Sequence, residues 1–106
     1  MEKYLLENFI NGWFIGNFQP TILDTEKFEV AVKKYRKGDS EEIHHHKIAN
    51  EYSIIISGLF KMNDEVCKEG DIFLVKPNEP IHFFCLEDGI TLVIKVPSVK
   101  GDKYID

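Results

Sequence analysis

The chain has 106 residues, of which 18 are acidic and 13 basic, and its formal net charge is −5. This length allows one compact domain, and the interspersed, mildly negative charge does not support an electrostatic grip on nucleic acid or on anionic lipid. The apolar runs are too short to cross a bilayer and the N-terminus lacks a secretory pattern, so we expect a soluble cytoplasmic protein.

Short β-rich runs separated by turn residues dominate the chain. Helix-like spacing occurs only within the first nine residues, before Gly12 interrupts it. The expected strands that follow are, in chain order, 13–18, 28–35, 52–56, 59–61, 72–75, 81–86 and 90–96. Glu87-Asp88-Gly89 is typical of a hairpin turn, and the residues after Val96 predict an irregular tail.

This spacing of strands and turns favours an all-β sandwich or a small closed barrel, because closure removes exposed strand edges. We expect a single domain over residues 1–106. The barrel would cover about 28–96, with an N-terminal strand or arm in 1–27 and a C-terminal tail in 97–106.

The most informative segment is a run of three histidines followed by a glutamate. If the run lies on a strand, His44 and His46 share one face and His45 points to the other. Glu51 follows after a turn-sized gap, so its carboxylate can join the two imidazoles. An isolated run of histidines is more typical of a charged surface loop, but the spacing to Glu51 and to His82 favours a metal site.

The same segment resembles the first motif of the cupins, G-x5-H-x-H-x4-E-x6-G. Every fixed position of that motif is matched, by Gly38, His44, His46, Glu51 and Gly58. The resemblance to the cupins covers about residues 28–96.

The second cupin motif, roughly G-x5-P-x-G-x2-H-x3-N, is partly present from Gly70 to His82. One extra residue lies between Gly70 and Pro77, Glu79 stands where glycine is usual, and Leu86 replaces the final asparagine. The resemblance still identifies His82 as the histidine of this motif.

The resemblance implies a double-stranded β-helix, also called a jelly-roll barrel, with a divalent metal ion inside. The implied metal ligands are His44, His46, Glu51 and His82. Three imidazole nitrogens and one carboxylate oxygen suit zinc, iron, manganese, nickel or cobalt, and they do not choose among these ions. Small cupins commonly pair, so we also expect a homodimer, with the aromatic run 13–18 in core or dimer packing rather than in a stacking platform.

The surroundings of the ion follow from strand parity. The residues expected on the ligands' face are Ser53, Ile55, Ser57 and Phe84. In strand 28–35, parity leaves two inward faces open: Val30, Val32 and Lys34, or Ala31, Lys33 and Tyr35. With the second face inward, Tyr35 is a candidate catalytic proton donor and Lys33 or Arg36 a candidate anion clamp, whereas amphipathic surface cover is the alternative.

Two other pairs of residues have simpler interpretations. Cys67 and Cys85 do not form a C-x-x-C pair, so we expect two small core residues rather than redox or zinc-binding thiols. Glu41 and Glu42 are expected in a solvated turn.

The leading functional hypothesis is a metal-dependent cupin enzyme that acts on a small polar metabolite, either a sugar derivative or a keto or hydroxy acid. Isomerisation or epimerisation at a metal-bound carbonyl is favoured, because a small barrel has little room for a second substrate. Iron-dependent dioxygenation of the metabolite is the first alternative. A non-catalytic module that binds a metal and a small molecule is the second.

Overall fold

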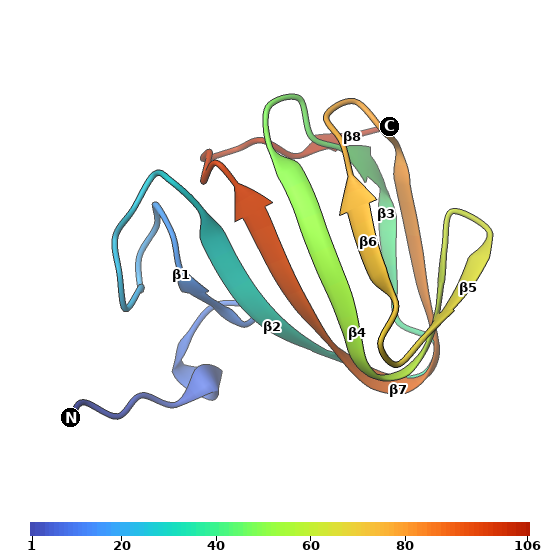
Figure 1. Ribbon diagram of the computed structural model, residues 1–106, viewed down its shortest axis with the longest axis horizontal. Coiled ribbons are helices and arrows are strands. Elements are labelled where there is room, and N and C mark those ends of the chain that lie inside the picture. Colours follow the sequence, from blue (N-terminus) through green and yellow to red (C-terminus); the bar gives the residue numbers. More distant parts are fainter.

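The computed structural model describes residues 1–106 as an almost entirely β protein (Figure 1). Its elements are a 3-10 helix η1 (Leu6–Asn8) and the strands β1 (Trp13–Ile15), β2 (Glu29–Tyr35), β3 (Ser40–His45), β4 (Asn50–Met62), β5 (Glu65–Lys68), β6 (Ile72–Val75), β7 (Ile81–Val96) and β8 (Tyr104–Ile105). The all-β prediction is confirmed. No helix has the length and apolar character needed to cross a membrane.

The N-terminal helix-like pattern yields only the single turn η1. None of the three residues of η1 is buried, and Leu5 and Ile10 on either side are 48% and 62% exposed. A longer helix here would lack a surface on which to bury its apolar face, and such burial provides most of the stability of helices in proteins.

Strands β4 and β7 are the two long strands on which the others assemble. They pair in antiparallel register from Asn50 opposite Val96 to Met62 opposite Phe83. β7 also pairs with β2 through its C-terminal half and with β3 through its N-terminal half, while β5 and β6 pair with β4. Both long strands bend at the bottom of Figure 1, so that β2 and β3 stand on opposite sides of a curled sheet.

Two glycines allow this bend. Gly58 has a φ of +90°, and a Cβ placed on it would lie 2.5 Å from the carbonyl oxygen of Asp88. A Cβ on Gly89 would lie 2.3 Å from the carbonyl oxygen of Ser57. The hairpin predicted at residues 87–89 is therefore wrong: these residues lie inside β7, where glycine permits close approach of two strands rather than a reversal of the chain.

The apolar core lies between the two sides of the curled sheet, near the bend. It consists of eight buried residues, Ile55, Phe60, Met62, Cys67, Val75, Ile81, Phe83 and Cys85. Both cysteines are free and almost fully buried, which confirms their interpretation as core residues. Burial raises the pKa of each thiol above its ordinary value, so neither is set up as a thiolate.

The end of the chain does not leave the fold as an irregular tail. β8 pairs with β3, placing Ile105 opposite His44 and Tyr104 opposite His45. The C-terminal segment, defined here as residues 98–106, therefore lies against the strand that carries the histidine run. Residues 97–103 are irregular, as predicted, but β8 was not predicted, because the pairing partner of a two-residue strand is far away in the sequence.

Candidate functional site

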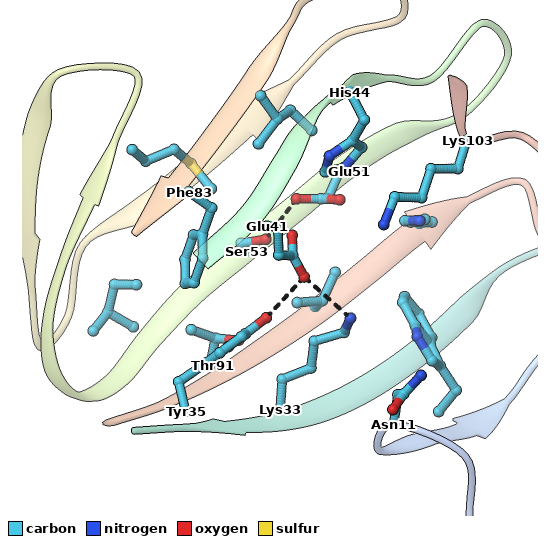
Figure 2. A pocket seen from close by; sticks show the side chains of 16 residues that line it. Asn11, Lys33, Tyr35, Glu41, His44, Glu51, Ser53, Phe83, Thr91 and Lys103 are labelled. Atoms are coloured by element: carbon cyan, nitrogen blue, oxygen red, sulfur yellow. Dashed lines mark hydrogen bonds and ion pairs between the residues drawn. The ribbon is translucent and has the colours of Figure 1, made fainter. Parts of the chain in front are cut away.

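The inner face of the curled sheet surrounds a cavity of about 260 Å³ (Figure 2). Its polar walls come from β2, β3 and β4 and include Lys33, Tyr35, Glu41, His44, Glu51 and Ser53. Ile55, Ile81 and Phe83 form its apolar floor. Such a mixture of apolar wall and a few convergent polar groups is typical of a small-molecule site.

The structure resolves the parity of β2. Ala31 is fully buried, and Lys33 and Tyr35 line the cavity, so the inward face is the second of the two that the sequence left open. On β4, Ser53 and Ile55 line the cavity as expected. Ser57 does not, because the pairing with β7 shifts between Ile55 and Ser57 and breaks the simple alternation.

A β-bulge brings Glu41 into the site. Glu41 stands opposite Phe83 and His44 opposite Ile81. Between these two pairs β3 therefore advances three residues while β7 advances two. Glu42 and Ile43 are exposed, whereas Glu41 and His44 both face the cavity. The prediction of a solvated turn was therefore wrong for Glu41, because the extra residue changes which side chains point inward.

Glu41 connects the two polar residues of β2. The hydroxyl Oη of Tyr35 donates to Oε1 of Glu41 at 3.4 Å, and Nζ of Lys33 lies 3.7 Å from the same oxygen (Figure 2). Burial and the charge of Glu41 raise the pKa of Tyr35 well above its ordinary value. Burial lowers the pKa of Lys33, and Glu41 opposes this shift. Tyr35 is thus a protonated donor facing a carboxylate.

The two inward histidines are fixed by backbone carbonyls. Nδ1 of His44 donates to the carbonyl oxygen of Glu42 at 2.8 Å, and Nδ1 of His46 donates to that of Asp102. Each ring therefore keeps its Nε2 atom available as a lone-pair donor. The rings meet edge to face with 5.4 Å between centroids, and burial lowers the pKa of His44, which favours its neutral form.

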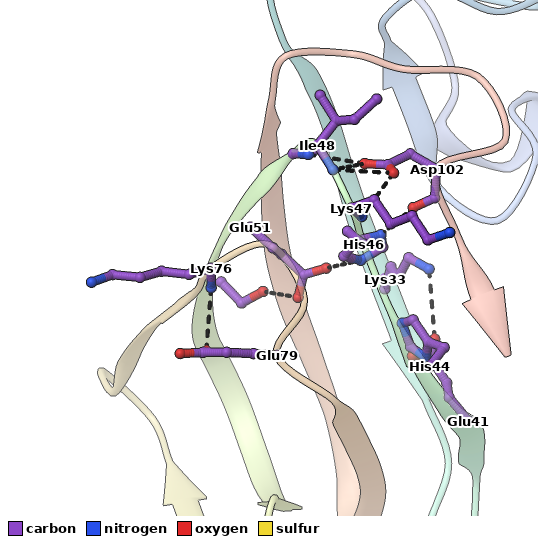
Figure 3. Close-up of polar contacts among 12 residues, drawn as sticks. Lys33, Glu41, His44, His46, Lys47, Ile48, Glu51, Lys76, Glu79 and Asp102 are labelled. Atoms are coloured by element: carbon purple, nitrogen blue, oxygen red, sulfur yellow. Dashed lines mark hydrogen bonds and ion pairs between the residues drawn. The ribbon is translucent and has the colours of Figure 1, made fainter. Parts of the chain in front are cut away.

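Glu51 lies beside His46. Its Oε1 atom is 3.4 Å from Nε2 of His46 (Figure 3), and its Oε2 atom accepts a hydrogen bond from Oγ of Ser53 at 3.1 Å (Figure 2). Burial alone would raise the pKa of Glu51, but the contact with His46 and the charge of Lys95 hold it below its ordinary value. Nε2 of His46 has no hydrogen-bond partner, although Oε1 of Glu51 lies 3.4 Å away.

His45 points away from this group, as alternation predicted. Its Nδ1 atom lies 2.6 Å from Oδ1 of Asp106, and its ring stacks on Tyr104 with 5.5 Å between centroids. His45 therefore joins the C-terminal segment to β3 instead of facing the cavity.

His82 is not with the other histidines. It is exposed, while Ile81 and Phe83 on either side of it line the cavity. The identification of His82 as a metal ligand and of Phe84 as a pocket residue is therefore wrong. The extra residue after Gly70 moves both side chains by one position, and a shift of one position reverses the face of a strand.

Counting the second motif from Gly70 with its own spacing places Lys76 at the proline, Asn78 at the glycine and Ile81 at the histidine. Asn78 has a φ of +70°, the left-handed conformation for which glycine is usual. The backbone thus keeps the motif, and an isoleucine occupies the place of its histidine.

The residues present do not fit the four-donor metal centre that the resemblance implies. Two imidazoles and a carboxylate are close to one another, but Ile81 offers no donor atom. No group of three His, Cys, Asp or Glu side chains is arranged so that it could hold a metal ion. Metal binding by His44, His46 and Glu51 stays a prediction.

The C-terminal segment holds the first motif in place, a role that the sequence alone did not decide. The Asp102 carboxylate accepts backbone N–H groups of Lys47 and Ala49, each at 2.9 Å, and of Ile48 at 3.2 Å (Figure 3). Burial alone would raise the pKa of Asp102, but these donors hold it below its ordinary value. The Gly101-Asp102 pair after a proline was the only local sequence feature that indicated a turn here. It does not identify the residues to which Asp102 hydrogen-bonds.

Trp13 and two further lysines complete the cavity. Trp13 lines it instead of lying only in core packing, and the indole ring lies near Nζ of Lys33 and Nζ of Lys95, at 5.2 Å and 5.1 Å from its centroid. Lys103, in the C-terminal segment, points its ammonium group into the cavity (Figure 2). Lys95 was not expected in the site, and for Lys103 the sequence left open whether the Gly101-Asp102-Lys103 cluster leaves the fold or caps the barrel.

Known structures share this fold. The chain is similar to an RmlC-like cupin from Shewanella frigidimarina, with 23% identity, 71% and 70% of the two chains covered and a TM-score of 0.67. A double-stranded β-helix protein from Klebsiella pneumoniae is 24% identical, with 79% of this chain and 74% of that chain covered and a TM-score of 0.69. KdgF from Halomonas sp. is 19% identical, with 71% of this chain and 74% of that chain covered and a TM-score of 0.65. No protein-family model matches the sequence, and no curated protein is significantly similar to it.

Proposed function

Starting from the cupin fold of this chain, a double-stranded β-helix, we propose that the protein is an enzyme that isomerises or epimerises a small polar metabolite inside the cavity. One observation carries the proposal: Tyr35 and Glu41 form an acid and base pair on the wall that also bears His44 and Glu51. Chemistry next to a carbonyl requires a group that takes a proton from carbon and a group that returns one.

The proton-transfer roles follow from charge and burial. Glu41 is the base, because its carboxylate faces the cavity and accepts a hydrogen bond from Oη of Tyr35 at 3.4 Å. Tyr35 is the acid, because its raised pKa keeps it protonated near neutral pH. The ammonium group of Lys33, next to Glu41, stabilises negative charge that develops on a carbonyl oxygen.

His44 and Glu51 bind the metabolite in this proposal. Neutral His44 and the carboxylate of Glu51 are suited to hold hydroxyl groups of a sugar derivative or of a hydroxy acid. The proton transfer by Tyr35 and Glu41 does not depend on a metal ion.

Hydrogen exchange in D2O tests the proposal. A panel of aldoses, ketoses and 2-hydroxy acids is incubated with the protein, and NMR follows deuterium uptake at the carbon next to the carbonyl or hydroxyl group. We expect uptake with one class of compound and a loss of about 100-fold or more in Tyr35→Phe. The matched control is Tyr52→Phe, an exposed tyrosine outside the cavity. Absence of uptake, or equal uptake in both variants, would contradict the proposal.

A second candidate function is iron-dependent dioxygenation. His44, His46 and Glu51 are the residue types, two histidines and one carboxylate, that hold iron in non-heme oxygenases, but in this structure they are not arranged as a group that could hold a metal. Oxygen consumption by iron-loaded protein in the presence of a compound from the same panel would favour this candidate. Binding of a compound with neither exchange nor oxygen uptake would favour the non-catalytic module.

We also propose that the protein is a homodimer. The outer face of β4 and β6 is apolar and exposed, with Ile72 70%, Leu74 47% and Ile56 44% exposed. Exposed apolar side chains gathered on neighbouring strands are typical of an interaction surface. Light scattering after gel filtration should give a dimer mass for the natural chain and a monomer mass for Ile72→Glu.

A further inference from the structure

Three lysines from distant parts of the sequence meet at the cavity. Lys33 lies on β2, Lys95 on β7 and Lys103 in the C-terminal segment, and all three line the same space. The ammonium groups of Lys33 and Lys95 lie 5.2 Å and 5.1 Å from the centroid of the Trp13 ring. Figure 2 shows the ammonium groups of Lys33 and Lys103 directed into the cavity.

The carboxylates of the cavity leave part of this charge unpaired. Glu41 pairs with Lys33, and Glu51 contacts Ser53 and His46. No ion pair joins Lys95 or Lys103 to a carboxylate. Three ammonium groups and two carboxylates line the cavity, in a chain whose net charge is −5. Glu29, which does not line the cavity, adds a negative charge near Lys95, so the local feature of the cavity is the gathering of three lysines.

Gathering like charges in a half-buried space costs free energy. The side chain of Lys33 is only 21% exposed, so water screens its charge poorly. The Trp13 ring offsets part of this cost through cation–π contacts, but it carries no net charge. A bound anion would supply the missing compensation, and ammonium groups are suited to carboxylate and phosphate oxygens.

From this arrangement we infer an anion subsite, formed by Lys33, Lys95 and Lys103 beside Trp13, that takes a carboxylate or phosphate group of the metabolite. The inference rests on the proposed function for the presence of a substrate, and it narrows that substrate to an anionic one. The cavity of about 260 Å³ has room for only a small molecule. The polar groups of Tyr35 and Glu41 would then face the uncharged part of the bound molecule.

Trp13 provides the measurement. It is the only tryptophan of the chain, so its fluorescence reports directly on the subsite. Chelator-treated protein is titrated at low ionic strength with inorganic phosphate, with succinate and with neutral glycerol. We expect saturable changes with phosphate or succinate, none with glycerol, and weakening as salt is added. A response confined to phosphate or to succinate identifies the preferred group.

Lys103→Gln is the decisive variant, because Lys103 is exposed and its loss should not disturb folding. We expect its dissociation constant for the anion to rise by about fivefold or more, and that of Lys95→Met to rise similarly. The matched control is Lys34→Met, which is exposed on β2 and does not line the cavity. Absence of saturable binding, or equal binding in Lys103→Gln and Lys34→Met, would overturn the inference.

The Tyr35→Phe variant separates this inference from the proposed function. It should bind the anion normally while losing hydrogen exchange. Anion binding by the natural chain without any hydrogen exchange would support the anion subsite and refute the proposed enzyme activity. Exchange that occurs only with neutral compounds would refute the subsite and leave the enzyme standing.

Discussion

Both segments that carry the cupin-like motifs offered histidines as metal ligands, one from a complete motif and one from a partial motif, yet only the first places its histidines inside. His46 in the first motif is 1% exposed, and both it and His44 are held by backbone carbonyls. His82 in the second motif is exposed, and an isoleucine faces the cavity in its place. A matching residue type at nearly the right spacing therefore says little until the register of the strand is known.

Removing the hydrogen bonds that hold the first motif should have the largest effect on the protein. Asp102→Ala removes the acceptor of three backbone N–H groups at residues 47–49 and leaves them without partners. We expect a loss of about 3 kcal/mol in the free energy of unfolding, measured by urea denaturation. The control is Asp24→Ala, an exposed aspartate, which should change stability by less than about 0.5 kcal/mol.

The pH dependence of stability gives a second test of Asp102. Its pKa is lower in the folded protein than its ordinary value, so its contribution is fully present above the ordinary pKa. The contribution is lost as the pH falls through the lower, folded value. The stability difference between the natural chain and Asp102→Ala should thus be constant near neutral pH and shrink in acid. A difference that grows in acid would contradict this account.

A histidine can instead be introduced at the inward position of the second motif. Ile81→His places an imidazole on the inner face opposite His44, where the cavity lacks a donor. We expect the affinity for Co²⁺ or Zn²⁺ to rise by about 10-fold to 100-fold, measured by competition with a chelator. Ile81→Gln, similar in size but a poor ligand, is the control. Equal affinities in the two variants would refute the corrected register.

Removing an inward histidine from the first motif tests whether that motif binds a metal ion. His46→Ala should lower the metal content of protein purified without a His tag by about an order of magnitude, because it removes a buried imidazole with a free Nε2 atom. His45→Ala, at the neighbouring and outward position, should keep the natural metal content in elemental analysis. Equal metal content in both variants would show that the first motif does not bind the ion.

The smallest effect is expected at the exposed histidine. His82→Ala should change the free energy of unfolding by less than about 0.5 kcal/mol and leave metal affinity unaltered, because the side chain lies outside the cavity. A marked loss of metal in this variant would restore His82 as a ligand and reject the count from Gly70.

The sequence by itself determined the β character of the chain, the cupin-like first motif and the shared face of His44 and His46. These features are local, because alternation, β-branched runs and turn residues act over a few positions. The burial of Cys67 and Cys85 was predictable for the same reason: a free cysteine outside any paired motif is a small apolar side chain.

Only the tertiary structure decided which groups share the cavity with that motif. The bulge that turns Glu41 inward, the face of β2 that presents Tyr35 and the exclusion of His82 all depend on pairing with β7. The roles of Asp102 and Lys103 depend on the return of the chain's end to β3. Each is a contact between residues far apart in the sequence, and strand register over such distances is set by the packing of the whole barrel.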